Sequence, residues 1–219
     1  MWEYRTFYER EMHSSISEDG AFIAIAGGHW DDCNGDCGSS KIYLFNKESN
    51  ATVWEYTPTD GGTYIYSITM SSDGQYITTS ATDGKIYLFH RDSNIPIWIY
   101  DVDLISSREG TLLQAVISND GKYIASFKDG YVFTLATENK TLLWKYNIGE
   151  YIERMEMSAD GRYIVVSTQD TVYLFENNAS QNGGEGDGGG SAKEAACQHG
   201  DTKLADDGFN HCICNDGEW

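Results

Sequence analysis

The chain has 219 residues, of which 40% are apolar and 13% aromatic, so it can bury a core, and its many tyrosines favour half-buried strands. Its formal charge of −19 repels nucleic acid phosphates and anionic membranes, which excludes both as expected partners. No apolar stretch reaches the roughly 18 residues of a membrane-spanning helix, so no membrane insertion is expected.

An aromatic pair, Trp-x-Tyr, recurs along the first 150 residues. The tryptophans are spaced by 52, 44 and 46 residues, at Trp2, Trp54, Trp98 and Trp144. A fixed period of this length is the mark of a repeat architecture. We predict that the four tryptophans pack between repeats and have no catalytic role.

A Ser-x-Asp-Gly turn and an apolar strand follow each aromatic pair. The four copies are SEDGAFIAIA (17–26), SSDGQYITTS (71–80), SNDGKYIASF (118–127) and SADGRYIVVS (158–167). The Asp-Gly step supplies the positive φ of a tight turn, and the strand after it alternates its side chains between two faces. Each copy therefore predicts a hairpin.

A second strand, apolar on both faces, completes each repeat. Its copies are KIYLF (41–45), KIYLF (85–89), GYVFT (130–134) and TVYLF (171–175). A strand that is apolar on both faces is buried on both sides, as in a sheet between two neighbouring sheets. In the second unit the pattern predicts four strands, near 64–70, 75–80, 85–90 and 95–100.

These residues resemble known β-propeller repeats. The Ser-x-Asp-Gly-x-Tyr-Ile turn is similar to that of WD-repeat propellers, and the strand ending in Trp resembles quinoprotein (PQQ-like) repeats, through Asn46, Ser49, Asn50 and Trp54. The resemblance implies an all-β fold with four blades of four antiparallel strands over 1–177. It says little about function, because propellers host many activities.

The strand count leaves three arrangements open. The chain begins on a Trp-bearing last strand near 2–5 and its last unit stops near Phe175 without one. The blades are a fragment of a larger ring, a four-bladed unit, or one of two copies that complete an eight-bladed ring. An open arc would expose strand edges, which favours self-association.

An insertion at 27–41 lengthens the first unit and is the candidate binding loop. Its binding residues are predicted to be His29, Trp30, Asp31, Asp32 and Asp36, because rim loops on rigid scaffolds carry recognition. Cys33 and Cys37 are close enough to form a disulfide. Asp32, Asn34 and Asp36 form a weak calcium candidate, and zinc on Cys33, Cys37 and His29 is a weaker one, so no metal is assigned.

The composition changes after the last repeat. Residues 178–193 are rich in Gly, Ser and acids and predict a flexible linker. Residues 194–219 resemble a truncated pacifastin-type cystine module through Cys197, Asn210, Cys212, Cys214 and Gly217, with Phe209 at a cysteine position. That resemblance implies a Cys197–Cys214 bridge and leaves Cys212 without its partner.

The sequence as a whole favours a binding or scaffolding protein over an enzyme. No nucleophile–base set, G-x-S-x-G, H-E-x-x-H or phosphate loop is present. Paired cysteines and the sequons at Asn50, Asn139 and Asn178 favour a secreted or cell-surface protein that recognises a protein or glycan without a cofactor. The alternatives are a quinone-dependent (PQQ-like) dehydrogenase fragment with PQQ and calcium, and a carrier for an inhibitor-like tail.

Overall fold

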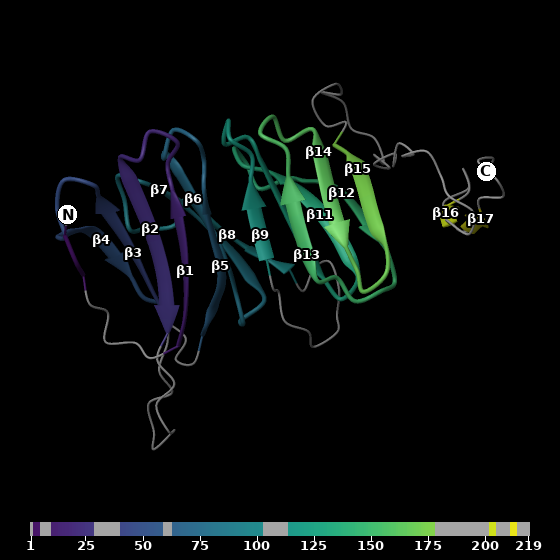
Figure 1. Cartoon of the computed structure of the whole chain (residues 1–219), viewed down its shortest axis with the longest axis horizontal. Coiled ribbons are helices and arrows are strands. Elements are labelled where there is room, and N and C mark those ends of the chain that lie inside the picture. The colour runs from purple at the N-terminus through teal and green to yellow at the C-terminus, as the bar shows by residue number, and fades with distance from the viewer. Residues whose placement is uncertain are drawn as a thin grey trace, which may run out of the picture.

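The computed structural model describes residues 2–4, 10–28, 40–58, 63–102, 114–177, 202–204 and 211–213 (Figure 1). Every regular element in these residues is a strand, and the strands form four antiparallel sheets and one hairpin. The predicted all-β architecture is therefore confirmed. Within the described ranges no helix has the length and apolar character needed to cross a bilayer.

Each of the four sheets is a meander of consecutive strands, and we call the sheets blades 1 to 4. Blade 1 contains β1 (Arg10–Ile16), β2 (Phe22–Gly28), β3 (Lys41–Asn46) and β4 (Thr52–Tyr56). Blade 2 contains β5 (Ile65–Met70), β6 (Tyr76–Ala81), β7 (Lys85–His90) and β8 (Trp98–Asp101). Blade 3 contains β9 (Gln114–Ile117), β10 (Tyr123–Lys128), β11 (Tyr131–Ala136) and β12 (Leu142–Asn147). Blade 4 contains β13 (Arg154–Met157), β14 (Tyr163–Ser167) and β15 (Val172–Glu176).

The third strand of each complete blade is buried on both faces, as its sequence predicts. In β3, Ile42 and Leu44 belong to the core shared with blade 2, while Phe45 contacts the rings of Trp2 and Tyr4. The same alternation recurs in β7, where Ile86 faces blade 3. A strand with apolar side chains on both faces can be covered only by sheets on both sides, so the blades stack face to face.

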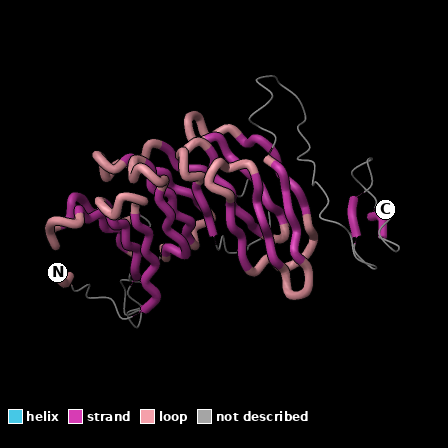
Figure 2. The backbone as a smooth tube through the Cα atoms, turned by 45° about the horizontal axis from the view of Figure 1, so that its top comes forward, coloured by secondary structure: helices cyan, strands magenta, loops and turns pink. Residues whose placement is uncertain are grey.

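The described residues form three hydrophobic core clusters, and each cluster lies between two successive blades. The second, for example, joins Leu88 and Trp98 of blade 2 to Ile124 and Phe133 of blade 3. The blades pass from one end of an open arc to the other, with residues 2–4 at one end and β15 at the other (Figures 1 and 2). Neighbouring blades contact through their first strands, β1 with β5, β5 with β9 and β9 with β13.

Two features differ from a simple set of four-stranded blades. Residues 2–4 were predicted as a last strand, but they form no ladder, because the described residues include no neighbouring strand to pair with them. Blade 4 ends at β15 and has no fourth strand among the described residues. Both ends of the arc therefore carry part of a blade.

The predicted tail contributes one short hairpin to the described structure. β16 (Thr202–Leu204) pairs with β17 (His211–Ile213), and Cys212 lies opposite Lys203. The predicted linker at 178–193, the boundary at 194, Cys197 and Cys214 lie outside the described residues. The domain boundaries and the pacifastin-like bridge stay predictions.

Candidate functional site

The loop predicted to bind a partner lies outside the described residues. This holds for His29, Trp30, Asp31, Asp32 and Asp36, for the disulfide candidates Cys33 and Cys37, and for the calcium candidate Asn34. Gly28 and Ser40, which flank the loop, lie at the end of blade 1 opposite its Ser-x-Asp-Gly turn. The ranges that the structure does describe contain no group of three His, Cys, Asp or Glu that could hold a metal ion.

The best-defined polar surface is formed by the four Ser-x-Asp-Gly turns, which we call the turn surface. In each turn the serine hydroxyl donates to the aspartate carboxylate, over 2.7 Å in blades 1, 2 and 3 and 2.6 Å in blade 4. The same carboxylate accepts the backbone N–H two residues later, at 2.8 to 3.1 Å. Each turn is therefore closed by its own side chains, as Ser and Asp do in local turns.

These hydrogen bonds lower the pKa of three turn carboxyls. For Asp19 and Asp160 the main cause is the serine hydroxyl, of Ser17 and Ser158, with a backbone N–H second. For Asp120 partial burial opposes the shift, but hydrogen bonds from Lys122 and Ser118 outweigh it and the pKa is again lowered. Donors that bond to the charged form stabilise it, so these three turns are held by ionised carboxylates.

Successive turns are also joined across the blades. The backbone N–H of Glu18 donates to Ser72 O, that of Ser72 to Asn119 O, and that of Asn119 to Ala159 O, each at 2.9 Å. An aromatic ring of one blade also lies against the glycine of the next turn, because a Cβ on Gly121 would be 2.7 Å from Tyr76 Cδ2. The same holds between Gly161 and Tyr123. The turns therefore form one continuous, fixed backbone track.

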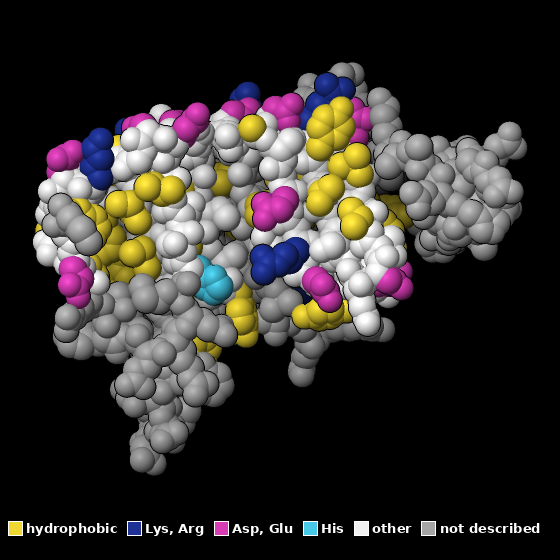
Figure 3. Space-filling model, in the orientation of Figure 1, with side chains coloured by type: hydrophobic (Ala, Val, Ile, Leu, Met, Phe, Trp, Pro, Cys, Tyr) yellow, Lys and Arg dark blue, Asp and Glu magenta, His cyan; other side chains and the backbone are white. Residues whose placement is uncertain are grey.

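Two positions of each turn vary while this backbone is repeated. The second position is held by Glu18, Ser72, Asn119 and Ala159, and the fifth by Ala21, Gln75, Lys122 and Arg162. The turn ends of the blades carry both acidic and basic side chains along the upper edge (Figure 3). A rigid track with varied side chains is the arrangement by which scaffolds present recognition residues.

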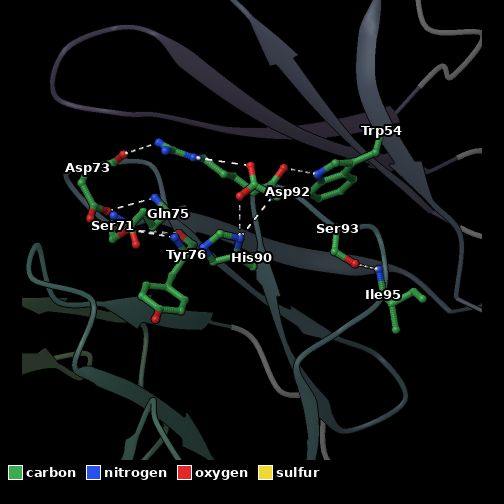
Figure 4. Close-up of polar contacts among 10 residues, drawn as sticks. Trp54, Ser71, Asp73, Gln75, Tyr76, His90, Asp92, Ser93 and Ile95 are labelled. Carbon is green, nitrogen blue, oxygen red and sulfur yellow. Dashed lines mark hydrogen bonds and ion pairs between the residues drawn. The ribbon is translucent and has the colours of Figure 1, made fainter.

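A polar cluster beside the turn of blade 2 extends this surface (Figure 4). The Arg91 guanidinium donates to Asp73 O at 3.2 Å and lies 4.9 Å from the centroid of the Phe22 ring in blade 1. His90 Nδ1 accepts the N–H of Asp92 at 3.3 Å and is 3.4 Å from its carboxylate. Arg91 thus spans blades 1 and 2 at the turn surface.

An aliphatic surface that the sequence pattern did not predict lies on blade 2, on β8 and on the segment that precedes it. Ile95 is 72% exposed, and Ile97 and Ile99 are also exposed, while the alternating residues Trp98 and Tyr100 are buried. The signal is present in the sequence as Ile95-Pro96-Ile97-Trp98-Ile99. It was overlooked because it reads as an ordinary buried strand, and only the assembled sheet shows which face meets solvent.

The four repeated tryptophans make one shared contact. Each indole N–H donates to the residue that follows the third strand of the next blade. The acceptors are Lys47 O for Trp2, Arg91 O for Trp54 and Thr137 O for Trp98, all at 2.7 Å, and Asn177 Oδ1 for Trp144 at 3.0 Å. Three of the rings also contact the phenylalanine of that strand. The tryptophans therefore bridge successive blades.

Comparison with known proteins agrees with this architecture. Residues 52–90 match the family model described as "WD domain, G-beta repeat", a segment that runs from β4 to the end of β7. No curated protein sequence matches the chain. Among solved structures, the β-propeller domain of Cps50 (Swd1) from Myceliophteria thermophila is similar, with 12% identity and a TM-score of 0.60.

That similarity covers 76% of this chain and 52% of the Cps50 domain, so the chain spans about half the length of that propeller. The matched repeat starts on the outer strand of one blade and ends on the third strand of the next, which is the unit bridged by each tryptophan. The resemblances to quinoprotein repeats and to the pacifastin-type module stay predictions. Residues 52–90 therefore match a WD repeat, and the blades as a whole share the fold of a β-propeller.

Proposed function

We propose that the chain is a non-catalytic scaffold that binds a protein through the turn surface. The observation that carries this proposal is the fixed backbone track of the turns, on which the side chains at two positions change from blade to blade. Binding residues on a rigid scaffold lose little conformational freedom when they meet a partner. The turn surface is therefore suited to recognition.

The charge of the chain indicates the kind of partner. The formal charge is −19, and carboxylates of lowered pKa stay ionised along the turns. An acidic surface attracts partners that present lysine and arginine, and the attraction weakens with added salt. The exposed Ile95 and Ile97 beside the surface would add apolar contact area at its edge.

Site-specific photo-cross-linking tests the location of the binding surface. A photoreactive residue replaces Asn119, exposed on the turn surface, and in a matched control it replaces Gln169, exposed at the opposite end of blade 4. With an extract of the natural source, we expect one protein to be cross-linked from position 119 and not from 169. Asn119→Lys should then weaken binding of that protein and Gln169→Lys should not. Equal cross-linking from both positions would contradict the assignment.

We further propose that the protein acts outside the cell, where its partner is a protein or a glycan. Asn50 and Asn139 head two of the three sequons and lie in exposed turns that follow β3 and β11. Exposed turns are accessible to glycosylation. Expression through a eukaryotic secretory pathway should give a chain whose mass falls after deglycosylation, and Asn50→Gln with Asn139→Gln should remove most of that change. An unglycosylated secreted chain would count against this proposal.

We also propose that binding requires no cofactor. Titration of the full chain with pyrroloquinoline quinone and calcium should change neither the quinone absorbance nor the melting temperature. A spectral shift together with a rise in melting temperature would instead support the quinone-dependent dehydrogenase.

A further inference from the structure

The two ends of the blade arc carry complementary halves of one joint between blades. The described part of the chain contains three complete joints, between blades 1 and 2, 2 and 3, and 3 and 4, and all three are built alike. Their common construction shows what each incomplete end lacks.

In a complete joint, the fourth strand of one blade pairs with its own third strand and packs on the next blade. Its tyrosine lies opposite Ile42, Ile86 or Val132, and its tryptophan opposite Leu44, Leu88 or Thr134. The tryptophan N–H then donates to the next blade. At the turn surface, a backbone N–H of one blade donates to a carbonyl of the next blade. An aromatic ring of the first blade also covers the turn glycine of the next blade.

At the N-terminal end, Trp2-Glu3-Tyr4 occupies the place of such a fourth strand. Its sequence is identical to Trp54-Glu55-Tyr56, and its aromatic contacts with the next blade are equivalent. The ring centroids of Trp2 and Phe45 are 5.7 Å apart, and those of Trp54 and Phe89 are 5.6 Å apart. The centroids of Tyr4 and Phe45 are 4.8 Å apart, and those of Tyr56 and Phe89 are 4.9 Å apart.

The main chain of this segment is held in the same way. The amide of Asn50 donates to Glu3 O at 3.2 Å, as that of Asn94 donates to Glu55 O at 3.1 Å. Residues 2–4 are therefore already positioned as the fourth strand of a blade whose first three strands lie elsewhere than in the described part of this chain.

The C-terminal end of the arc is the reverse case, because the described residues of blade 4 form three strands without a fourth. Val172 of β15 is 71% exposed, whereas the equivalent Ile42, Ile86 and Val132 are fully buried. Val165 of β14 is 39% exposed, whereas the equivalent Thr78 is fully buried. An apolar face next to an unpaired strand edge is a site for strand addition.

The turns at the two ends complement each other as well. Tyr163 is exposed, but its equivalents Tyr76 and Tyr123 each cover the glycine of the next turn. At Gly20 of blade 1, unlike at the other three turn glycines, no atom of the described residues would lie within 4 Å of an added Cβ. Ile16 on the same blade is 61% exposed, while its equivalents Met70 and Ile117 are buried in the joints.

We propose that blade 4 of one copy joins blade 1 of a second copy, and that residues 2–4 of the second copy become the fourth strand of blade 4. The register of the complete joints places Tyr4 opposite Val172 and Trp2 opposite Leu174. Tyr163 then covers Gly20 of the second copy, and the N–H of Ala159 donates to Glu18 O. This inference concerns assembly and is independent of the proposed binding function.

The arrangement of the arc favours a second copy over closure of one chain on itself. Residues 2–4 and β15 lie at opposite ends of the arc, and hydrophobic side chains gather at both ends, over β2 and β3 and over β14 and β15 (Figures 1 and 3). A head-to-tail contact closes into a ring when its rotation allows. One chain covers 52% of the length of the similar propeller domain, so two chains make a ring of comparable extent.

Matched surface substitutions test this assembly. Ile16→Lys blocks the N-terminal half of the joint and Val172→Lys blocks the C-terminal half. Ile95→Lys is the control, because Ile95 is as exposed as Val172 and lies at neither end. The molar mass of the full chain and of each variant is measured by light scattering after size exclusion, at about 50 μM and in about 0.15 M salt, which screens repulsion between the acidic copies.

The wild-type chain and Ile95→Lys should have twice the chain mass of 24.5 kDa, and each blocked variant should have the mass of one chain. A mixture of the two blocked variants should regain a dimer, because each retains the half-joint that the other lacks. This complementation also separates blocked assembly from failure to fold. A monomeric wild type, a blocked variant that still dimerises, or a mixture that stays monomeric would each overturn the proposal.

Discussion

At the scale of single residues, the repeated tryptophan has two roles at once. Trp98 is buried between blades 2 and 3, and its N–H donates to Thr137 O, which makes it both a packing residue and a hydrogen-bond donor. A buried carbonyl without its donor costs free energy in addition to the lost packing. The indole is therefore difficult to replace with a residue of another size or polarity.

Replacement of Trp98 should separate these two roles. Trp98→Ala is expected to lower the free energy of unfolding by about 3–5 kcal/mol, the usual cost of removing a buried aromatic ring. Trp98→Phe keeps most of the packing but leaves Thr137 O without its donor, and should cost about 1–3 kcal/mol. Urea denaturation measures both values. The exposed neighbour Ile97→Ala should change the midpoint little, and a loss as large as that of Trp98→Ala there would contradict this account.

The turn carboxylates predict a dependence of stability on pH. Because the folded-state pKa of Asp19, Asp120 and Asp160 lies below the unfolded value of 3.8, ionisation of these groups stabilises the fold above that value. The contribution is lost as the pH falls from about 3.8 through the folded-state pKa. The urea midpoint of unfolding, measured between pH 6 and pH 2, should decrease as the pH is lowered through that window. In Asp160→Asn the midpoint should decrease less steeply. If the urea midpoint of the variant decreased with pH as steeply as that of the wild type, Asp160 would not contribute to the pH dependence.

At the scale of elements, the turn between the first two strands carries contacts both within and between blades. Its Ser and Asp hydrogen bonds are local and follow from the four-residue motif alone. The cover of Gly121 by Tyr76 is different, because the two residues belong to different blades. Sequence reasoning predicted the turn and the strands of the hairpin, but it missed that the tyrosine packs on the next blade's glycine.

A matched pair of glycine substitutions should measure this contact between blades. Gly20 and Gly121 have φ values of +67° and +71°, so alanine costs about 1–2 kcal/mol of backbone strain at either position. Only at Gly121 does the new Cβ also meet a ring, 2.7 Å from Tyr76 Cδ2. In the monomeric Val172→Lys background, Gly121→Ala should therefore lower the urea midpoint more than Gly20→Ala. Equal losses would mean that the ring moves aside freely.

At the scale of the whole molecule, the described blades form a linear array in which each core cluster joins two successive blades. In such arrays the terminal units lack one stabilising interface and open more readily. Blade 4 has three strands among the described residues and an exposed face, whereas blade 2 is covered on both sides. The array also explains how four sequence repeats correspond to three complete blades and one three-stranded blade in the described part of the chain.

Amide hydrogen exchange should show this gradient and its change on assembly. In monomeric Ile16→Lys, the amides of β15 should exchange faster than those of β7, which lies between two neighbouring strands. In the assembled wild-type chain, β15 gains a fourth strand, and its protection should approach that of β7. If β15 exchanges equally fast in both, strand addition at this edge is wrong, whatever the molar mass.

The sequence by itself determined the all-β class, the four repeats and the strands of each blade, because turns and alternating strands depend on residues only a few positions apart. It also contained both halves of the proposed joint, the Trp2/Tyr4 pair and the apolar strand at 171–175. Only the tertiary structure decided which apolar residues stay exposed, so that Val172 meets solvent while the equivalent Ile42 is buried. The physical reason is that burial of a blade's face depends on the next blade, through contacts between residues some 40 positions apart.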